Sequence, residues 1–190
     1  MVDISRKTNE TNIQLSLNIR GQKHIQVETG IGFFDHMLAS LAFWAGWNLN
    51  LKCQGDIVVD THHTVEDVGL SLGSAFYKEW SQNTNIVRIA YAFCPLDEAL
   101  TRVVVDVCNR PYSTFDAEFK VEKVGEFETS VTGHFFRSFA QEARITQHIR
   151  VLHGENAHHM IETMFKGLGL ALRRACTLTD DGTQSTKGIL

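Results

Sequence analysis

The sequence predicts an α+β protein made of two duplicated half-domains, with helices packed between two mixed four-stranded sheets. Three observations lead to this prediction. The motif HHxxE occurs twice, at residues 62–66 and 158–162, roughly half the chain apart. Short segments alternate apolar and polar residues, which is typical of strands with one buried face. Each motif also opens a longer segment with helical periodicity. Two layers of sheet around helices bury all of these apolar faces.

The first half-repeat is expected to cover residues 1–85. Residues 12–19 alternate as an amphipathic strand that turns at Gly21, and residues 24–27 are its expected hairpin partner. Strands are further expected at 48–54 and 57–60, and helices at 34–43 and 63–80. We place the end of this half after the polar run Asn83-Thr84-Asn85.

The second half-repeat, residues 86–190, is expected to follow the same order. Strands are predicted at 90–94, 99–107, 112–118 and 146–152, with helices at 131–143 and 158–176. The last segment, from Asp180 to Gly188, is polar and contains glycine, so its composition favours a mobile tail. It could instead close over an anion, because it carries Ser185 and Lys187.

Length and charge narrow the classes of function. A chain of 190 residues with 43% hydrophobic content can bury a sizeable core, as one domain or as two fused half-domains. The net charge of −4 argues against a general nucleic-acid binder, which needs an excess of clustered cations. The four cysteines are far apart, and the sequence predicts neither a signal peptide nor an apolar run of membrane length. A cytoplasmic protein without a membrane partner is therefore expected.

The repeated motif has the geometry of a metal site. Residues four apart share one face of a helix, so His62 and Glu66 can bind the same cation. His63 points about 100° away and would reach a different ion. The second copy, His158 to Glu162, repeats this geometry. Each copy is therefore expected to give a His and a Glu to one metal and its other His to a second metal.

Two upstream histidines complete the predicted ligand set. His36 and His134 lie at comparable distances before the two motifs, each beside a pair of phenylalanines. Imidazole with carboxylate suits Mn, Fe, Co, Ni or Zn better than Ca or Mg, and the absence of thiolates argues against a structural zinc. A single pair of adjacent histidines is usually structural, but repetition with a Glu at the same offset favours metal binding. The eight expected ligands are His36, His62, His63, Glu66, His134, His158, His159 and Glu162.

Longer motifs connect the chain to a known family. Residues 30–38, 62–67, 154–159 and 185–188 strongly resemble segments of the imidazoleglycerol-phosphate dehydratases of histidine biosynthesis, and the resemblance runs from about residue 6 to residue 190. It implies a hydro-lyase that converts D-erythro-imidazole glycerol phosphate to imidazole acetol phosphate and water. It also implies two Mn²⁺ per active site and a twenty-four-subunit homo-oligomer with active sites between neighbouring subunits.

The resemblance also implies how the ligands and the reaction are organised. One metal would be held by His36, His63, His158 and Glu162, and the other by His62, Glu66, His134 and His159, which agrees with the crossing expected from helix geometry. The substrate has no carbonyl beside the C–H bond that must break. A metal-bound imidazolate would therefore expel the hydroxyl, giving a diazafulvene-like intermediate in which that C–H is acidic.

The remaining site residues follow from the same resemblance. Glu10 is the expected acid–base residue, although the sequence alone favours a solvated residue before the first strand. Taken singly, each of the expected phosphate-binding cations would be an ordinary surface charge. The residues that match the family's phosphate contacts are Arg88, Arg110, Lys166, Ser185 and Lys187.

Two other classes of protein would also use His and carboxylate ligands. A dinuclear hydrolase needs a bridging carboxylate and an activated water, and it would cleave a generic phosphate ester. A purely structural role, in which metals join subunits into a shell, predicts assembly without turnover. The structural role would leave Glu10 and the expected phosphate-binding residues without a purpose.

Overall fold

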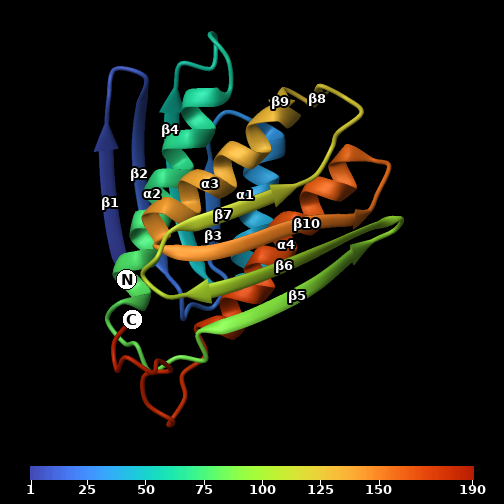
Figure 1. Cartoon of the computed structure of the whole chain (residues 1–190). Helices are drawn as coiled ribbons and strands as arrows, with labels where there is room; N and C mark the ends of the chain where they lie inside the picture. The colour runs from blue at the N-terminus through green and yellow to red at the C-terminus, as the bar shows by residue number, and fades with distance from the viewer.

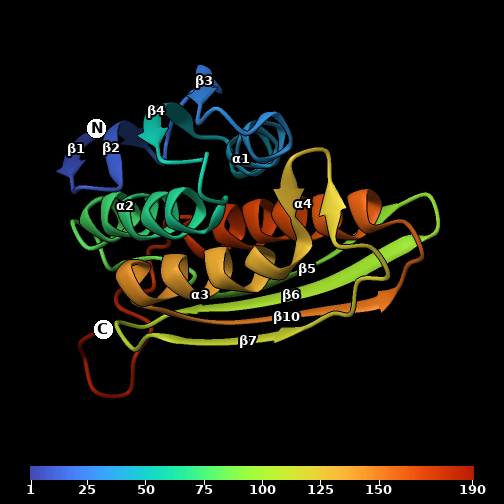
Figure 2. The same ribbon diagram turned by 90° about the horizontal axis from the view of Figure 1, so that it is seen from above.

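In the computed structural model, which describes residues 1–190, two four-stranded sheets enclose four long helices (Figure 1). The view from above shows the layers directly (Figure 2). One sheet covers two of the helices, those two helices lie on the other pair, and the second sheet closes the opposite side. The predicted α+β fold, with helices between two mixed sheets, is therefore confirmed.

The first sheet and its two helices come from the N-terminal part of the chain. The neighbouring strands β1/β2 and β2/β4 are antiparallel, whereas β3/β4 is parallel, and the sheet order is β1-β2-β4-β3. A parallel pair needs a crossover connection, which one of the helices supplies here. The elements are β1 (Val2–Lys7), β2 (Thr11–Asn18), β3 (Ile25–Glu28), α1 (Gly32–Ala45), β4 (Asn48–Gly55) and α2 (His62–Trp80).

The second sheet repeats the first strand for strand. Its order is β5-β6-β10-β7, again with two antiparallel pairs followed by one parallel pair. A small hairpin and a 3-10 turn are inserted before the crossover helix. The elements are β5 (Ile89–Leu96), β6 (Ala99–Val107), β7 (Tyr112–Asp116), β8 (Lys123–Val124), β9 (Phe127–Glu128), η1 (Thr129–Val131), α3 (Thr132–Ala143), β10 (Ile145–His153) and α4 (Ala157–Ala175).

The core fills the space between the sheets and is rich in aromatic rings. In β2, Ile13, Leu15 and Leu17 point inward and are buried, while the residues between them are more exposed, as the alternating pattern predicts. The rings of Phe135 and Phe165 stack with centroids 4.8 Å apart, joining α3 to α4. The largest fully buried side chains include Trp47, Trp80, Phe34, Phe76, Phe127, Phe135, Phe136, Phe139 and Phe165.

Glycines allow the helices of the two halves to pack closely. Helix α1 packs on α4, and α2 packs on α3. A Cβ atom at Gly73 of α2 would lie 2.4 Å from the carbonyl oxygen of Phe139, and one at Gly169 of α4 would lie 2.5 Å from that of Leu41. Both distances are shorter than any real contact. The two glycines follow the HHxxE motifs at the same offset, so the close approach is part of the repeat.

One predicted strand pairing and one predicted strand are wrong, although residues 25–28 do form a strand, β3. Residues 24–27 do not form a hairpin with β2; instead β3 pairs in parallel with β4, and the hairpin partner of β2 is β1, which the sequence reading missed. Residues 57–60 form a turn rather than a strand. The apolar run in this turn has no neighbouring strand to pair with, since β4 ends at Gly55 and α2 begins at His62. Val58 is accordingly 94% exposed.

Other boundaries differ by a few residues. Helix α1 begins at Gly32 rather than at residue 34, and β7 ends at Asp116 rather than at residue 118. The β8–β9 hairpin was not expected, because each of its strands has only two residues and shows no alternation. None of the helices is both long and apolar enough to cross a membrane. The boundary between half-repeats at residue 85 and the closing role of the tail remain predictions.

Replacing Gly169 by Ala is expected to lower the free energy of unfolding by about 1–3 kcal/mol, because the added methyl overpacks the contact with α1. Denaturant unfolding at a fixed protein concentration measures the effect. Gly32→Ala is the control, since a Cβ there has no atom within 4 Å, and it should change stability by less than about 0.5 kcal/mol. Equal losses in both variants would contradict the packing argument.

Candidate metal centres

The packing of α1 on α4 builds the first cluster of metal-type ligands. His36 of α1 joins His158 and Glu162 of α4, and their donor atoms all lie within 4.8 Å of one another. One oxygen of Glu162, Oε2, is 3.1 Å from Nε2 of His158 and 3.5 Å from Nε2 of His36. The other oxygen, Oε1, is 2.6 Å from Nζ of Lys166. Burial acts to raise the pKa of Glu162, yet the pKa is lowered overall, because Lys166 and the two imidazoles stabilise the carboxylate.

The packing of α2 on α3 builds the second cluster in the same way. His62 and Glu66 of α2 meet His134 of α3, again with all donor atoms within 4.8 Å. Nε2 of His62 is 3.3 Å from Oε2 of Glu66, and the rings of His62 and His134 have centroids 4.5 Å apart. Burial lowers the pKa of His134, and the nearby His62 and Arg137 lower it further. The neutral imidazole, which is the form that binds metals, is therefore favoured.

These clusters fit a divalent transition metal. Each offers two imidazole nitrogens and one carboxylate oxygen, a set that suits Mn, Fe, Co, Ni or Zn. Each also leaves coordination positions for a further ligand or a substrate. The structure brings six of the eight predicted ligands together, and each upstream histidine joins the motif of the opposite half. This exchange follows from the pairing of α1 with α4 and of α2 with α3.

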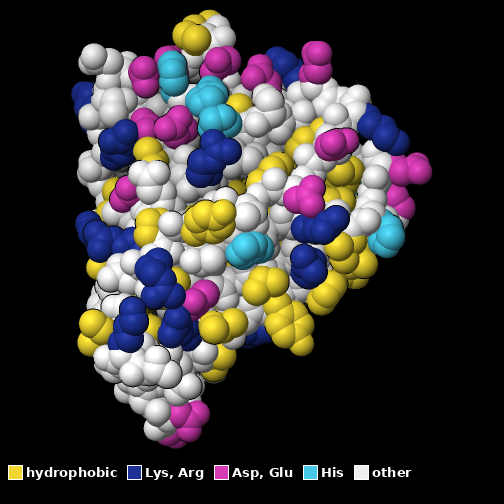
Figure 3. Space-filling view, viewed as in Figure 1, with side chains coloured by type: hydrophobic (Ala, Val, Ile, Leu, Met, Phe, Trp, Pro, Cys, Tyr) yellow, Lys and Arg dark blue, Asp and Glu magenta, His cyan; other side chains and the backbone are white.

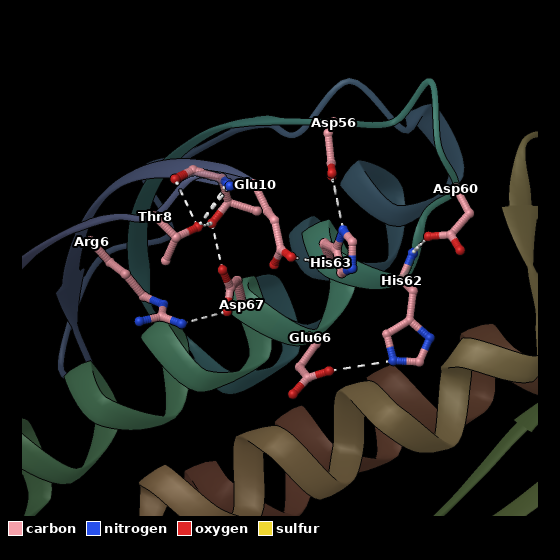
Figure 4. Close-up of polar contacts among 10 residues, drawn as sticks. Arg6, Thr8, Glu10, Asp56, Asp60, His62, His63, Glu66 and Asp67 are labelled. Atoms are coloured by element: carbon pink, nitrogen blue, oxygen red, sulfur yellow. Dashed lines mark hydrogen bonds and ion pairs between the residues drawn. The ribbon is translucent and has the colours of Figure 1, made fainter.

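The second histidine of the first motif lies outside both clusters. His63 turns away from His62 and Glu66 and faces the loop after β4 (Figure 4). Its Nδ1 is 3.1 Å from Oδ2 of Asp56, and its Nε2 is 3.7 Å from Oε1 of Glu10. The hydrogen bond to Asp56 raises the pKa of His63, burial opposes this, and Glu10 adds to the rise.

The second histidine of the other motif is held in a similar way. Nδ1 of His159 lies 2.7 Å from Oε2 of Glu98, and its Nε2 lies 3.9 Å from Oδ2 of Asp97. The hydrogen bond from His159, followed by the backbone N–H groups of Asn156 and Glu155, lowers the pKa of Glu98 to about 2. The same contact raises the pKa of His159. Within one chain, therefore, neither His63 nor His159 joins the cluster that contains the other motif.

A partly buried ion pair holds Glu10 beside the first motif. Asp67 follows Glu66 directly on α2 and lies 2.7 Å from Nη2 of Arg6, while the hydroxyl of Thr11 donates to its other oxygen. These two contacts fix both ends of the β1–β2 turn, which carries Glu10, against the second turn of α2 (Figure 4). The sequence reading missed Asp67, although its position directly after HHxxE was an available signal.

The expected phosphate-binding residues separate into two groups. Lys166 lies beside the first candidate cluster, where its Nζ is 2.6 Å from Oε1 of Glu162. Arg88 binds Asp106 through two hydrogen bonds of 2.6 and 3.0 Å, and it donates to the carbonyl oxygen of Gln184 in the tail at 2.6 Å. The bond to Asp106 raises the pKa of Arg88 against the opposing effect of burial. Nη2 of Arg110 lies 3.8 Å from Oδ2 of the same Asp106.

The group near the tail is far from both clusters. The backbone N–H of Arg88 donates to the carbonyl oxygen of Ala175, the last residue of α4, whereas His158 lies in the first turn of that helix. The 19 residues of α4 span about 28 Å at the rise of an α-helix. One group of histidine side chains lies at the top of Figure 3, with others at its centre and right edge, and a group of Lys and Arg side chains gathers above its lower end. In the tail itself, the N–H of Lys187 donates to Oγ of Ser185. One chain therefore does not bring Arg88 or the tail to its own metal ligands.

Comparison with protein families decides the ancestry of the chain. Residues 29–172 match the model of the imidazoleglycerol-phosphate dehydratase family. The chain belongs to this family. The dehydratase of Caldicellulosiruptor bescii is 45% identical over 190 residues, covering 100% of this chain and 98% of that protein. The dehydratase of Caldanaerobacter subterraneus subsp. tengcongensis is 49% identical, covering 99% of this chain and 98% of that protein.

Solved structures of the family agree with the fold. The crystal structure of the Staphylococcus aureus dehydratase matches with a TM-score of 0.84 and a sequence identity of 38%. The match covers 94% of this chain and 100% of that one. The structure of IGPD from Pyrococcus furiosus in complex with (S)-C348 is 36% identical, with a TM-score of 0.85, covering 98% of this chain and 100% of that one. The family and the enzyme class predicted from the sequence, a dehydratase of the lyase type, are confirmed.

Arg6→Met is expected to lower the free energy of unfolding by about 1–3 kcal/mol, because it leaves the buried carboxylate of Asp67 without its charged donor. Denaturant unfolding measures the loss. The neighbouring Lys7→Met is the matched control, since Lys7 is exposed and makes no ion pair, and its effect should stay within about 0.5 kcal/mol. An unchanged stability in Arg6→Met would show that the ion pair does not hold the β1–β2 turn.

Proposed function

We propose that the chain is an imidazoleglycerol-phosphate dehydratase, which removes water from D-erythro-imidazole glycerol phosphate to give imidazole acetol phosphate in histidine biosynthesis. The observation that carries this proposal is the pair of three-donor clusters, in a chain whose residues 29–172 match the model of this family. Relatives named for this activity cover nearly the full length of the chain. The cytoplasmic location expected from the cysteine pattern remains a prediction.

The proposed cofactor is two Mn²⁺ per active site. The donor sets support it, because each cluster combines imidazole with carboxylate and has room for further ligands. When bound, the Mn²⁺ would act as a Lewis acid that favours the deprotonated imidazole of the substrate and orients the ring. His36, His158 and Glu162 would hold one ion, and His62, Glu66 and His134 the other. Lys166, on Glu162, would keep that carboxylate ionised.

Glu10 is the proposed acid–base residue. The hydrogen that leaves is on a carbon next to a hydroxyl, so it is not acidified by a carbonyl, and a positioned carboxylate is needed once the ring has begun to expel that hydroxyl. Three features support Glu10. Its turn is held by the ion pair between Arg6 and Asp67, its Oε1 is 3.7 Å from Nε2 of His63, and its carboxylate is half exposed. Glu10 can therefore carry a proton to or from a bound substrate.

We propose further that each active site is completed by a neighbouring subunit, within the twenty-four-subunit assembly expected of the family. Two features support this. His63 and His159 lie outside the clusters of their own chain, and Arg88 is near the far end of α4 from His158. The partner subunit's His63 would join the His36 cluster, and the partner subunit's His159 would join the His62 cluster. Arg88, Arg110, Ser185 and Lys187 would likewise bind the phosphate of a substrate whose imidazole is held by another copy.

Chelation provides the first test of the proposed function. Turnover of imidazole glycerol phosphate by the purified protein is expected to fall by at least about 100-fold after treatment with a chelator and to return with added Mn²⁺, because the ring can then be activated again. Product formation is followed directly. A metal-loaded, assembled protein that shows no turnover would favour a purely structural role for the metals. Cleavage of a generic phosphate ester instead would favour a dinuclear hydrolase.

Mixed assemblies test whether the sites are shared. Glu162→Gln removes a ligand and Arg88→Ala removes a phosphate contact, so each variant alone is expected to be nearly inactive. Assemblies that contain both variants, isolated through two different tags, should recover about one quarter of the parent activity, because random pairing leaves some sites with both intact residues. Mixing Glu162→Gln with His158→Ala is the control, since both changes damage the same cluster. Equal inactivity of the two mixtures would contradict shared sites.

A further inference from the structure

A carboxylate lies at Nδ1 of each of the two histidines outside the clusters, His63 and His159. For His63, the Nδ1 atom is 3.1 and 3.2 Å from the two carboxylate oxygens of Asp56. For His159, it is 2.7 Å from Oε2 of Glu98. By contrast, Glu66 and Glu162 contact the Nε2 atoms of His62 and His158, and these glutamates belong to the clusters themselves.

A carboxylate at Nδ1 determines which ring nitrogen can bind a metal. An ionised carboxylate only accepts hydrogen bonds, so Nδ1 must carry the hydrogen. In the neutral ring, Nε2 then has the free lone pair and is the atom that can ligate. The hydrogen bond also fixes the plane of the ring and makes Nε2 more basic. Asp56 and Glu98 therefore prepare His63 and His159 to act as Nε2 ligands.

Backbone hydrogen bonds fix the carboxylate of Glu98 and the main chain of Asp56 independently of the histidines. Glu98 lies in the β5–β6 turn and accepts the N–H groups of Glu155 and Asn156, at 3.1 and 2.8 Å, from the loop that begins α4. Asp56 lies just after β4, where its N–H donates to the carbonyl oxygen of Glu10 at 3.1 Å and its carbonyl oxygen accepts from the N–H of Val59 at 2.8 Å. The loop before α4 thus fixes the carboxylate of Glu98, and the loop after β4 fixes the backbone that presents Asp56.

We propose that Asp56 and Glu98 are positioning residues that orient His63 and His159 as Nε2 ligands for the two metal sites. The inference rests on the proposed function, because it requires these histidines to serve as ligands across subunits. It goes further by assigning each positioning residue to a different site. Asp56 serves the site that contains His36, and Glu98 serves the site that contains His62. Neither residue touches a metal or the substrate.

Titration of the assembled, chelator-treated protein with Mn²⁺ alone tests the assignment. Glu98→Gln preserves the shape and the acceptor for the two backbone N–H groups but removes the charge that acts on His159. It is expected to weaken one of the two Mn²⁺ sites by about 10–100-fold and to leave the other unchanged. Asp56→Asn should weaken the other site by a similar factor. Glu126→Gln, an exposed acid in the β8–β9 turn without an ion pair, should bind both ions like the parent.

A double variant distinguishes positioning from a merely structural role. Once His159→Ala has removed the ligand, adding Glu98→Gln should cause no further loss of affinity, because the two residues act as one unit. A further loss would overturn the inference, as would parent-like Mn²⁺ binding by Glu98→Gln when His159→Ala weakens a site. The inference would also be overturned if Glu98→Gln lowered the melting temperature as much as Glu98→Ala and weakened both Mn²⁺ sites equally. Unchanged binding in His159→Ala would instead refute the proposed ligand set.

Discussion

Contact between helices of opposite halves, α1 with α4 and α2 with α3, sets the positions of the chemical groups in this protein. Gly169 and Gly73 lie where no Cβ would fit, so the backbones approach closely at equivalent points. This contact brings His36 to the second HHxxE motif and His134 to the first. Neither cluster could form within its own half, and the two sheets cover the outer sides of the helix pairs that build them.

Carboxylates organise the surroundings of these clusters in three different ways. Glu66 and Glu162 point into the clusters and are candidate ligands. Asp67 is buried and holds the turn that carries Glu10 through Arg6 and Thr11. Asp56 and Glu98 lie at Nδ1 of the outer histidines. In the proposed site, the same chemical group would therefore bind a metal, support a turn or orient a histidine, depending on which loop or helix presents it and on what it faces.

In the proposed function, each chain contributes parts of a site rather than a whole one. Lys166 is beside the metal ligands, but Arg88 and the C-terminal tail lie near the other end of α4. The length of that helix, about 28 Å, cannot be bridged by side chains. Assembly is therefore part of the proposed chemistry. In this proposal, one sequence carries all the expected ligands and phosphate contacts, but residues of two subunits are needed to form one site.

The sequence by itself determined the features that depend on local geometry. The helical repeat places His62 with Glu66 on one face and His63 on another, and alternation identified most strands of both sheets. Only the tertiary structure decided which strands pair, as for β3. The family resemblance, not periodicity, placed His36 with the second motif and His134 with the first, and the packing of α1 on α4 and of α2 on α3 gives the physical cause. The tertiary structure also decided where His63 and His159 find their carboxylates. These features depend on packing between segments distant in the chain, and residue periodicity carries no information about such contacts.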